Sequence, residues 1–243
     1  MEDPVEKNCD RRIEMIPKKI HYCWFGENKK NKLVLKCIES WKHFFPDFEI
    51  IEWNESNTDL HENRYVECAY QLKKWAFVSD YVRMKVLYEN GGIYFDTDVE
   101  VLKPFPDEVL NLSAFTGLES FSLKVSPGLV FACEPKNVVA KMMIDSYNQD
   151  QFKNESIEKI KTINIRITEL LEKNGFKACE KKQTILGLTI FPSSVFCAYD
   201  GKKRKLNIQD NTLSVHHYAA SWLPWYRKVR LFCGTIIRKM IYR

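Results

Sequence analysis

The N-terminal part of the chain alternates between short β-type patterns and longer helical ones. Residues Ile20–Phe25 are bulky and favour extended backbone, which predicts a strand that stops at Gly26. From Lys32 to Phe45 the apolar residues recur at spacings of three and four, which predicts an amphipathic helix. Phe48–Trp53 again has the composition of a strand. The order strand–helix–strand indicates a βαβ unit.

A second strong helical pattern covers Lys73–Asn90, and the pair Gly91-Gly92 closes it. Ile93–Phe95 then predicts a short buried strand, which runs directly into the acidic triplet Asp96-Thr97-Asp98. We therefore expect two carboxylates to lie at the end of this strand.

The rest of the chain continues with alternating strand and helix patterns. Helices are predicted at Val138–Tyr147 and Ile157–Lys173. Strands are predicted at Val99–Leu102, Ala114–Leu118, Leu129–Ala132, Val195–Tyr199 and Leu213–Tyr218. The alternation predicts an α/β fold.

Composition supports one domain with a full core, because 45% of the 243 residues are hydrophobic. We expect this domain to span residues 13–223. The first dozen residues hold no apolar segment, and no run of about 18 apolar residues follows, so neither a secretory signal nor a membrane span is expected. The eight cysteines are scattered without a C-x-x-C pair, which favours a reduced cytoplasmic compartment over a zinc site.

The basic charge is concentrated in a C-terminal tail, residues 224–243. Without the six Lys and Arg residues between Arg227 and Arg243, the net charge of +5 becomes −1. This distribution argues against a nucleic-acid binder, which carries a broader basic face. The tail fits an amphipathic helix, and we expect it to attach peripherally to the inner face of a bacterial cytoplasmic membrane. The alternative is a helix that packs its apolar stripe on the domain.

The acidic triplet is the main candidate for chemistry. Asp96 and Asp98 are two residues apart in extended backbone, so their side chains project to the same side. Carboxylates at the carboxyl end of a strand are suited to Mn²⁺ or Mg²⁺. An isolated D-x-D triplet is usually a solvated turn. Here, however, Asp80 and Arg83 share one face of the preceding helix, which favours a site.

The motifs from Ser79 to Asp98 resemble the D-x-D sugar-binding region of glycosyltransferase family 32. That family includes yeast mannosyltransferases and bacterial capsular-polysaccharide enzymes, and it is related to the glucosylating domain of large clostridial toxins. The order S-D-x-x-R, G-G-x-Y and D-x-D is present in full, as Ser79, Asp80, Arg83, Gly91, Gly92, Tyr94, Asp96 and Asp98. The opening IPKKIHYCWFG and the late HHYAASW also resemble the family. Where many relatives carry an Asn-rich loop, this chain has Ser126-Pro127-Gly128.

The resemblance implies a role for each matching residue. Asp96 and Asp98 would hold Mn²⁺ or Mg²⁺ together with His217. The cation and Arg83 would stabilise the departing nucleoside diphosphate, so we expect Asp98, Asp96 and Arg83 to be catalytic. Donor contacts are expected from six residues, namely Trp24, which would stack on the base, Asp80, Arg83, Tyr94, Ser221 and Trp222.

The implied fold is of the GT-A type, a Rossmann-like, mainly parallel sheet flanked by helices, followed here by the basic tail. The implied activity is a retaining, metal-dependent transfer of a hexose or N-acetylhexosamine. The donor would be a UDP-sugar, or else GDP-mannose, and the acceptor a glycan or lipid-linked glycan in capsule or lipopolysaccharide synthesis. No covalent nucleophile stands out in the sequence.

Two other functions fit part of the pattern. A phosphatase of the haloacid-dehalogenase type also places D-x-D after a strand, with the first Asp as nucleophile, but such motifs usually open the fold. A catalytically inactive module that binds nucleotide sugars or glycans would keep the same residues. Hydrolysis of a nucleotide sugar would separate a transferase from both alternatives.

Overall fold

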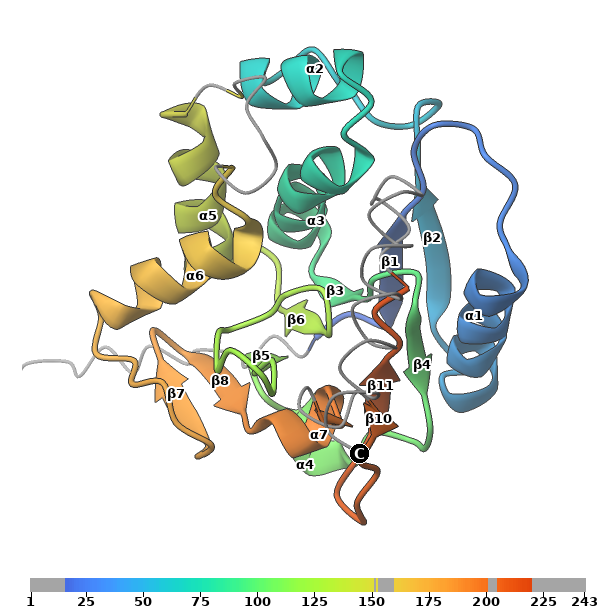
Figure 1. The fold of residues 1–243 in the computed structure, drawn as a ribbon, viewed down its shortest axis with the longest axis vertical. Coiled ribbons are helices and arrows are strands. Elements are labelled where there is room, and N and C mark those ends of the chain that lie inside the picture. The colour runs from blue at the N-terminus through green and yellow to red at the C-terminus, as the bar shows by residue number, and fades with distance from the viewer. Residues whose placement is uncertain (1–15, 151, 153–159, 201–204, 220–243) are drawn as a thin grey trace, which may run out of the picture.

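A seven-stranded mixed sheet forms the centre of the computed structural model, which describes residues 16–150, 152, 160–200 and 205–219 (Figure 1). Its order is β2-β1-β3-β6-β5-β8-β7. The strands are β1 Lys19–Cys23, β2 Glu49–Trp53, β3 Gly92–Tyr94, β5 Ala114–Gly117, β6 Phe131–Cys133, β7 Gln183–Ile185 and β8 Leu188–Phe191. Strands β6 and β7 run against the other five, so the sheet is mostly parallel. The predicted α/β fold is confirmed.

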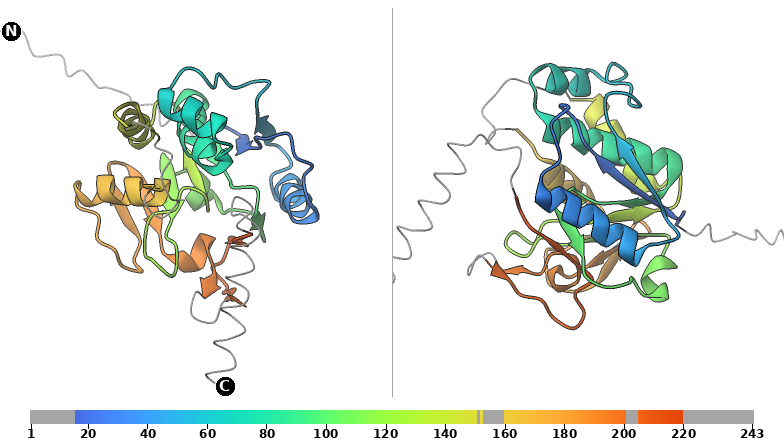
Figure 2. Two further views of the ribbon diagram at one scale, coloured as in Figure 1. Left: turned by 45° about the horizontal axis from the view of Figure 1, so that its top comes forward. Right: turned by 90° about the vertical axis from the view of Figure 1, so that its right-hand side faces the viewer.

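Helices cover both faces of this sheet (Figures 1 and 2). One apolar cluster joins a face of the sheet to α2 Arg64–Gln71, α3 Trp75–Asn90, α5 Val138–Asn148 and α6 Ile163–Glu172. A second cluster joins the other face to α1 Lys32–Phe44, α4 Asp107–Leu110 and α7 Ser193–Phe196. Neighbouring strand residues contribute to opposite clusters, as Ile93 and Tyr94 of β3 do. This is why the strands read as continuous apolar runs.

Two small antiparallel pairs lie outside the central sheet. Strand β4, Val99–Val101, pairs with β11, Ser214–His216, which brings the late part of the chain against the acidic triplet. Strand β9, Tyr199–Asp200, pairs with β10, Lys205–Leu206.

The double glycine fixes the junction between α3 and β3. Gly91 and Gly92 have φ angles of +64° and +102°, in the region that side chains disfavour. A Cβ on Gly92 would lie 2.7 Å from the carbonyl oxygen of Lys19 on β1. Beside it, the buried His21 accepts from Trp53 Nε1 at 3.0 Å and donates from Nε2 to Gly91 O at 2.8 Å. Burial lowers the pKa of His21 to about 4, so the ring is neutral in this network.

Most predicted elements form where the patterns placed them, and two differ. The strand predicted at Val195–Tyr199 is wrong, because Ser193–Phe196 forms helix α7 and only Tyr199–Asp200 is extended. A short apolar run cannot distinguish a strand from a buried helical turn. The helix predicted from Ile157 begins at Ile163, with Thr162 as its N-cap. Helix α2 and strands β7 and β8 were not predicted from the sequence.

None of the helices in the described ranges has the length and apolar character needed to cross a membrane. The predicted tail helix at 224–243 lies outside the described residues, as do Ser221 and Trp222.

Candidate metal and donor site

The acidic triplet forms the turn between β3 and β4 at the carboxyl end of β3. The backbone N–H of Asp96 donates to Gly128 O at 3.0 Å, and Val99 N donates to Asp96 O at 3.0 Å. Because β1 and β3 are parallel, this turn lies at the same sheet edge as the residues that follow β1. The backbone therefore holds both aspartates in a fixed loop.

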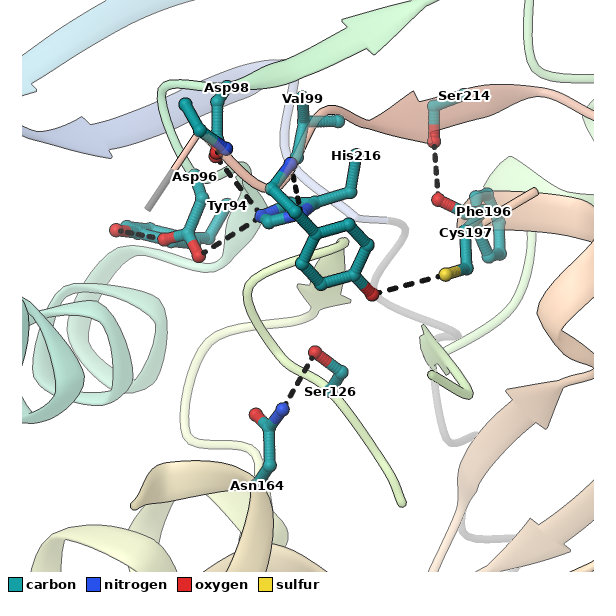
Figure 3. A network of polar contacts seen from close by, with 12 residues as sticks. Tyr94, Asp96, Asp98, Val99, Ser126, Asn164, Phe196, Cys197, Ser214 and His216 are labelled. Carbon is teal, nitrogen blue, oxygen red and sulfur yellow. Dashed lines mark hydrogen bonds and ion pairs between the residues drawn. The ribbon is translucent and has the colours of Figure 1, made fainter. Parts of the chain in front are cut away.

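Asp96, Asp98 and His216 bring one ligand atom each to within 4.8 Å of one another. His216 Nε2 lies 3.0 Å from Asp98 Oδ1 and 3.9 Å from Asp96 Oδ2. Figure 3 shows the three side chains turned toward one another. Two carboxylate oxygens and one imidazole nitrogen, all half-buried, are a donor set that fits a divalent cation and leaves room for phosphate oxygens.

The charges in this cluster are strongly coupled. Burial alone would raise the pKa of Asp98, but His216 and the Ala219 N–H, which donates to Asp98 Oδ2 at 2.8 Å, lower it to about 2. Burial alone would lower the pKa of His216, yet Asp98 and Asp96 raise it to about 10. The two carboxylates thus stabilise a positive charge at this point of the cluster.

The histidine in this cluster is His216, whereas the sequence led us to expect His217 as the ligand. Residue His216 pairs with Val99 across β4 and β11, and its ring faces the two aspartates. The next residue points to the other side because side chains alternate along a strand. His217 Nε2 accordingly lies 2.8 Å from Glu100 Oε2, and Glu100 also binds Lys36.

Arg83 is buried, with 4% of its surface exposed, and it connects the helix α3 to the acidic turn. Its Nη2 donates to Asp80 Oδ1 at 3.0 Å and lies 3.1 Å from Asp96 Oδ1. The guanidinium also lies over the ring of Tyr94, 4.7 Å from its centre. Tyr94 in turn donates its hydroxyl to Asp96 Oδ1 at 3.2 Å. These contacts fix the orientation of the Asp96 carboxylate.

Asp80 is linked to the acidic turn through Arg83, which also pairs with Asp96. Its side chain is 9% exposed, and burial raises its pKa to about 6 although Arg83 opposes the shift. Asp80 therefore contacts Arg83 as its ion partner.

Trp24 follows β1 at the same edge of the sheet and is half-buried. Its Nε1 donates to Asn28 O at 2.7 Å, and Lys30 Nζ lies 5.6 Å from the ring centre. Lys30 Nζ is also paired with Glu52 Oε2 at 2.7 Å. The indole is thus held by its nitrogen and keeps part of its surface accessible.

Comparison with known families identifies the segment that contains this turn. Residues 31–116 match the family of the glycosyltransferase sugar-binding region containing a DXD motif. This segment is similar to the DXD-containing sugar-binding region of glycosyltransferases. Asp96 and Asp98 are the two acidic residues of its DXD motif.

One curated protein is similar to a larger share of the chain. Subversion of eukaryotic traffic protein A of Legionella pneumophila subsp. pneumophila (strain Philadelphia 1) is 24% identical over 173 residues, which cover 59% of this chain and 27% of that protein. The chain thus spans about a quarter of that relative's length.

Two solved glycosyltransferase structures are also similar to the chain. The PaToxG glycosyltransferase is 20% identical with a TM-score of 0.48, covering 66% of this chain and 69% of that one. A glycosyltransferase involved in the glycosylation of the major capsid of PBCV-1 is 12% identical with a TM-score of 0.48, covering 82% and 94%.

Two residues that contact the DXD motif were not singled out for that role from the sequence. His216 lies about 120 positions beyond the motif, and only the adjacent pair His216-His217 on a predicted strand hinted that one of them faces it. Gly128 lies in the loop before β6, and its missing side chain leaves room for the Asp96 carboxylate. A glycine in a loop gives no signal of such an approach by itself.

Replacing Gly128 with alanine is expected to lower Mn²⁺ affinity by about tenfold or more. The added Cβ would lie 2.1 Å from Asp96 Oδ2 and 3.0 Å from Arg83 Nη1. The end of the Asp96 side chain can move away, so the cost falls on the cation site and not on the fold. Calorimetric titration with Mn²⁺, beside a thermal melt, measures both effects.

The matched control is Gly117→Ala. Its Cβ would contact Phe196 Cβ at 3.2 Å in the core and would not approach the DXD motif. We expect Gly117→Ala to lower the melting temperature and to keep wild-type Mn²⁺ affinity. Equal Mn²⁺ affinity in Gly128→Ala and the wild type would show that Asp96 does not need this space.

Proposed function

We propose that the chain is a retaining, metal-dependent glycosyltransferase that moves a hexose or N-acetylhexosamine from a nucleotide sugar to a hydroxyl of a glycan or lipid-linked glycan. A UDP-sugar is the favoured donor and GDP-mannose the alternative. The proposal rests on one observation above all. The two acidic residues of the DXD motif and His216 converge on one point at the carboxyl edge of the sheet.

Asp96, Asp98 and His216 are proposed to hold Mn²⁺ or Mg²⁺. When bound, the cation would neutralise charge on the diphosphate and favour its departure. Asp98 contributes a carboxylate that stays ionised across the physiological range, since its pKa is about 2. Arg83 and Tyr94 orient Asp96 through the two contacts on its Oδ1. We therefore infer that Arg83 acts by holding Asp96 and by adding positive charge near the diphosphate.

Four further residues are proposed to support binding of the donor or the cation. Trp24 is proposed to stack on the nucleotide base, which its position at the sheet edge and its half-buried ring support. Ser221 and Trp222 are proposed to contact the diphosphate, as the family resemblance implies. His217 is proposed to support the site through Glu100.

A role in capsule or lipopolysaccharide synthesis at the inner face of a bacterial membrane is also part of the proposal. It rests on the charge and the apolar spacing of residues 224–243 alone. Sedimentation of the chain with anionic vesicles, compared with a chain truncated after Leu223, measures this attachment.

The decisive test of activity is a donor panel with Mn²⁺ or Mg²⁺. We expect UDP or GDP to be released from one of UDP-glucose, UDP-galactose, UDP-N-acetylhexosamines and GDP-mannose, and the release to stop on addition of a chelator. Calorimetry with the same donors measures binding where hydrolysis is slow. If no donor is hydrolysed or bound while p-nitrophenyl phosphate is cleaved, the transferase proposal fails and the phosphatase alternative replaces it.

A further inference from the structure

A cleft of about 440 Å³ lies in the C-terminal half of the chain, outside the DXD site. Its walls come from the loop after β5, from α7 and from the β9–β10 pair. Two aromatic rings and several hydroxyl and amide groups line it, among them Phe121, Tyr199, Ser120, Ser194, Asn207 and Gln209. Its size lies in the usual range for small-molecule sites, roughly 300–1,000 Å³.

One aromatic side chain joins this cleft to the cation site. The ring of Tyr218 lies 5.0 Å from that of Tyr199 and 5.5 Å from that of Phe121. The same ring lies 4.2 Å from the ring of His216. Tyr218 therefore contacts both the aromatic residues of the cleft and one of the proposed cation ligands.

The Tyr218 ring is held firmly in this position. Its hydroxyl lies 3.1 Å from Cys197 Sγ, and its backbone has a φ of +48°. Ala198, which lines the cleft, has a φ of +43°. Left-handed backbone is costly for residues other than glycine, and it gathers at binding sites that the surrounding structure holds in place.

The lining chemistry selects the class of ligand. None of the described lining residues is a lysine or an arginine, and Asp200 adds a carboxylate to the lining. The described lining therefore offers no cationic side chain for a diphosphate or a lipid phosphate. Aromatic faces beside hydroxyl and amide groups suit a neutral sugar, which presents C–H groups on its faces and hydroxyls at its edges.

We propose that this cleft binds the acceptor as a neutral saccharide unit, with Phe121 and Tyr199 packing on the sugar face and Tyr218 in contact with both the cleft and the cation site. The proposal rests on the proposed transferase function and names its acceptor class. Phe121 is the exposed part of this surface, since 56% of it is accessible in the absence of a ligand. Apolar side chains with such exposure gain most when a ligand covers them.

The test measures saccharide binding directly, with the full chain and saturation-transfer NMR. The probes are galactose, glucose, N-acetylglucosamine and their β-linked disaccharides, and UDP and GDP with Mn²⁺ are titrated separately by calorimetry. We expect at least one saccharide to bind, and Phe121→Ala to weaken that binding about fivefold or more. Asn207→Ala should weaken it as well through loss of a polar contact. Val138→Ala, at an equally exposed apolar position on α5, is the matched control and should bind the saccharide as the wild type does.

The two proposals fail in different ways. If UDP or GDP binds with Mn²⁺ but no saccharide binds, or if Phe121→Ala and Asn207→Ala both bind like the wild type, the acceptor cleft is overturned and the transferase proposal stands. If neither UDP nor GDP binds with Mn²⁺, the transferase proposal itself is overturned. A thermal melt of each variant excludes loss of folding as the cause of weaker binding.

Discussion

Asp98→Ala is expected to reduce metal-dependent release of UDP or GDP by on the order of 100-fold or more. The carboxylate supplies one of the three ligand atoms, accepts the Ala219 N–H and lies 3.0 Å from His216. Its removal therefore takes away a ligand, a negative charge and the anchor of the chain after β11. Nucleotide release with the preferred donor, measured across a range of Mn²⁺ concentrations, gives both the rate and the metal affinity.

Two further variants separate these contributions. Asp98→Asn keeps an oxygen for the Ala219 N–H but removes the charge, so we expect its activity to stay close to that of Asp98→Ala. Asp47→Ala removes a carboxylate whose side chain is 78% exposed and should behave like the wild type. More than half of the wild-type rate in Asp98→Ala, at saturating Mn²⁺, would remove Asp98 from the metal site.

Arg83→Met is expected to lower the free energy of unfolding by about 3–5 kcal/mol and to abolish donor hydrolysis. Methionine retains much of the volume but removes the partner of Asp80, whose side chain is 9% exposed, and one contact of Asp96. Breaking a buried pair costs more than its attraction contributes, because it leaves a charge without solvent or partner. Urea unfolding followed by fluorescence measures the change.

The loss of stability should depend on pH. Burial has raised the pKa of Asp80 from 3.8 to about 6, so the folded state binds its proton more tightly than the unfolded state does. The stability from this group is full below pH 3.8 and falls as the pH rises through about 6. Without Arg83 the pKa rises further, so Arg83→Met should be more destabilising at pH 8 than at pH 5.

Two variants provide the controls for this prediction. Asp80→Asn combined with Arg83→Met removes the unpaired charge, and we expect it to recover part of the stability and to lose the added pH dependence. Arg64→Met, at an exposed position on α2, should change the unfolding free energy by less than about 0.5 kcal/mol. An unfolding free energy for Arg83→Met that matches the wild type at pH 8 would contradict the buried pair.

Local sequence patterns predicted the elements that carry the DXD motif. The apolar spacing of Lys73–Asn90, the glycine pair and the run Ile93–Phe95 each have a local physical cause, namely recurring apolar residues of a buried helix, positive φ and strand burial. They place the triplet at the end of β3 without knowledge of any distant residue. The segment Val195–Tyr199 was predicted wrongly because packing decides the state of such a short run. Its Phe196 stacks on Phe115 at 5.7 Å as part of α7.

The sequence by itself determined the α/β order of the chain and the position of Asp96 and Asp98 at a strand end, since both follow from period and neighbouring residues. The tertiary structure alone decided which histidine joins them. The register of β11 on β4 turns His216 toward the acidic turn and His217 toward Glu100. The tertiary structure also places Gly128 against Asp96. It places the ring of Tyr218 in contact with both His216 and Tyr199 of the cleft. Such contacts depend on how distant segments pair and pack, which no local pattern encodes.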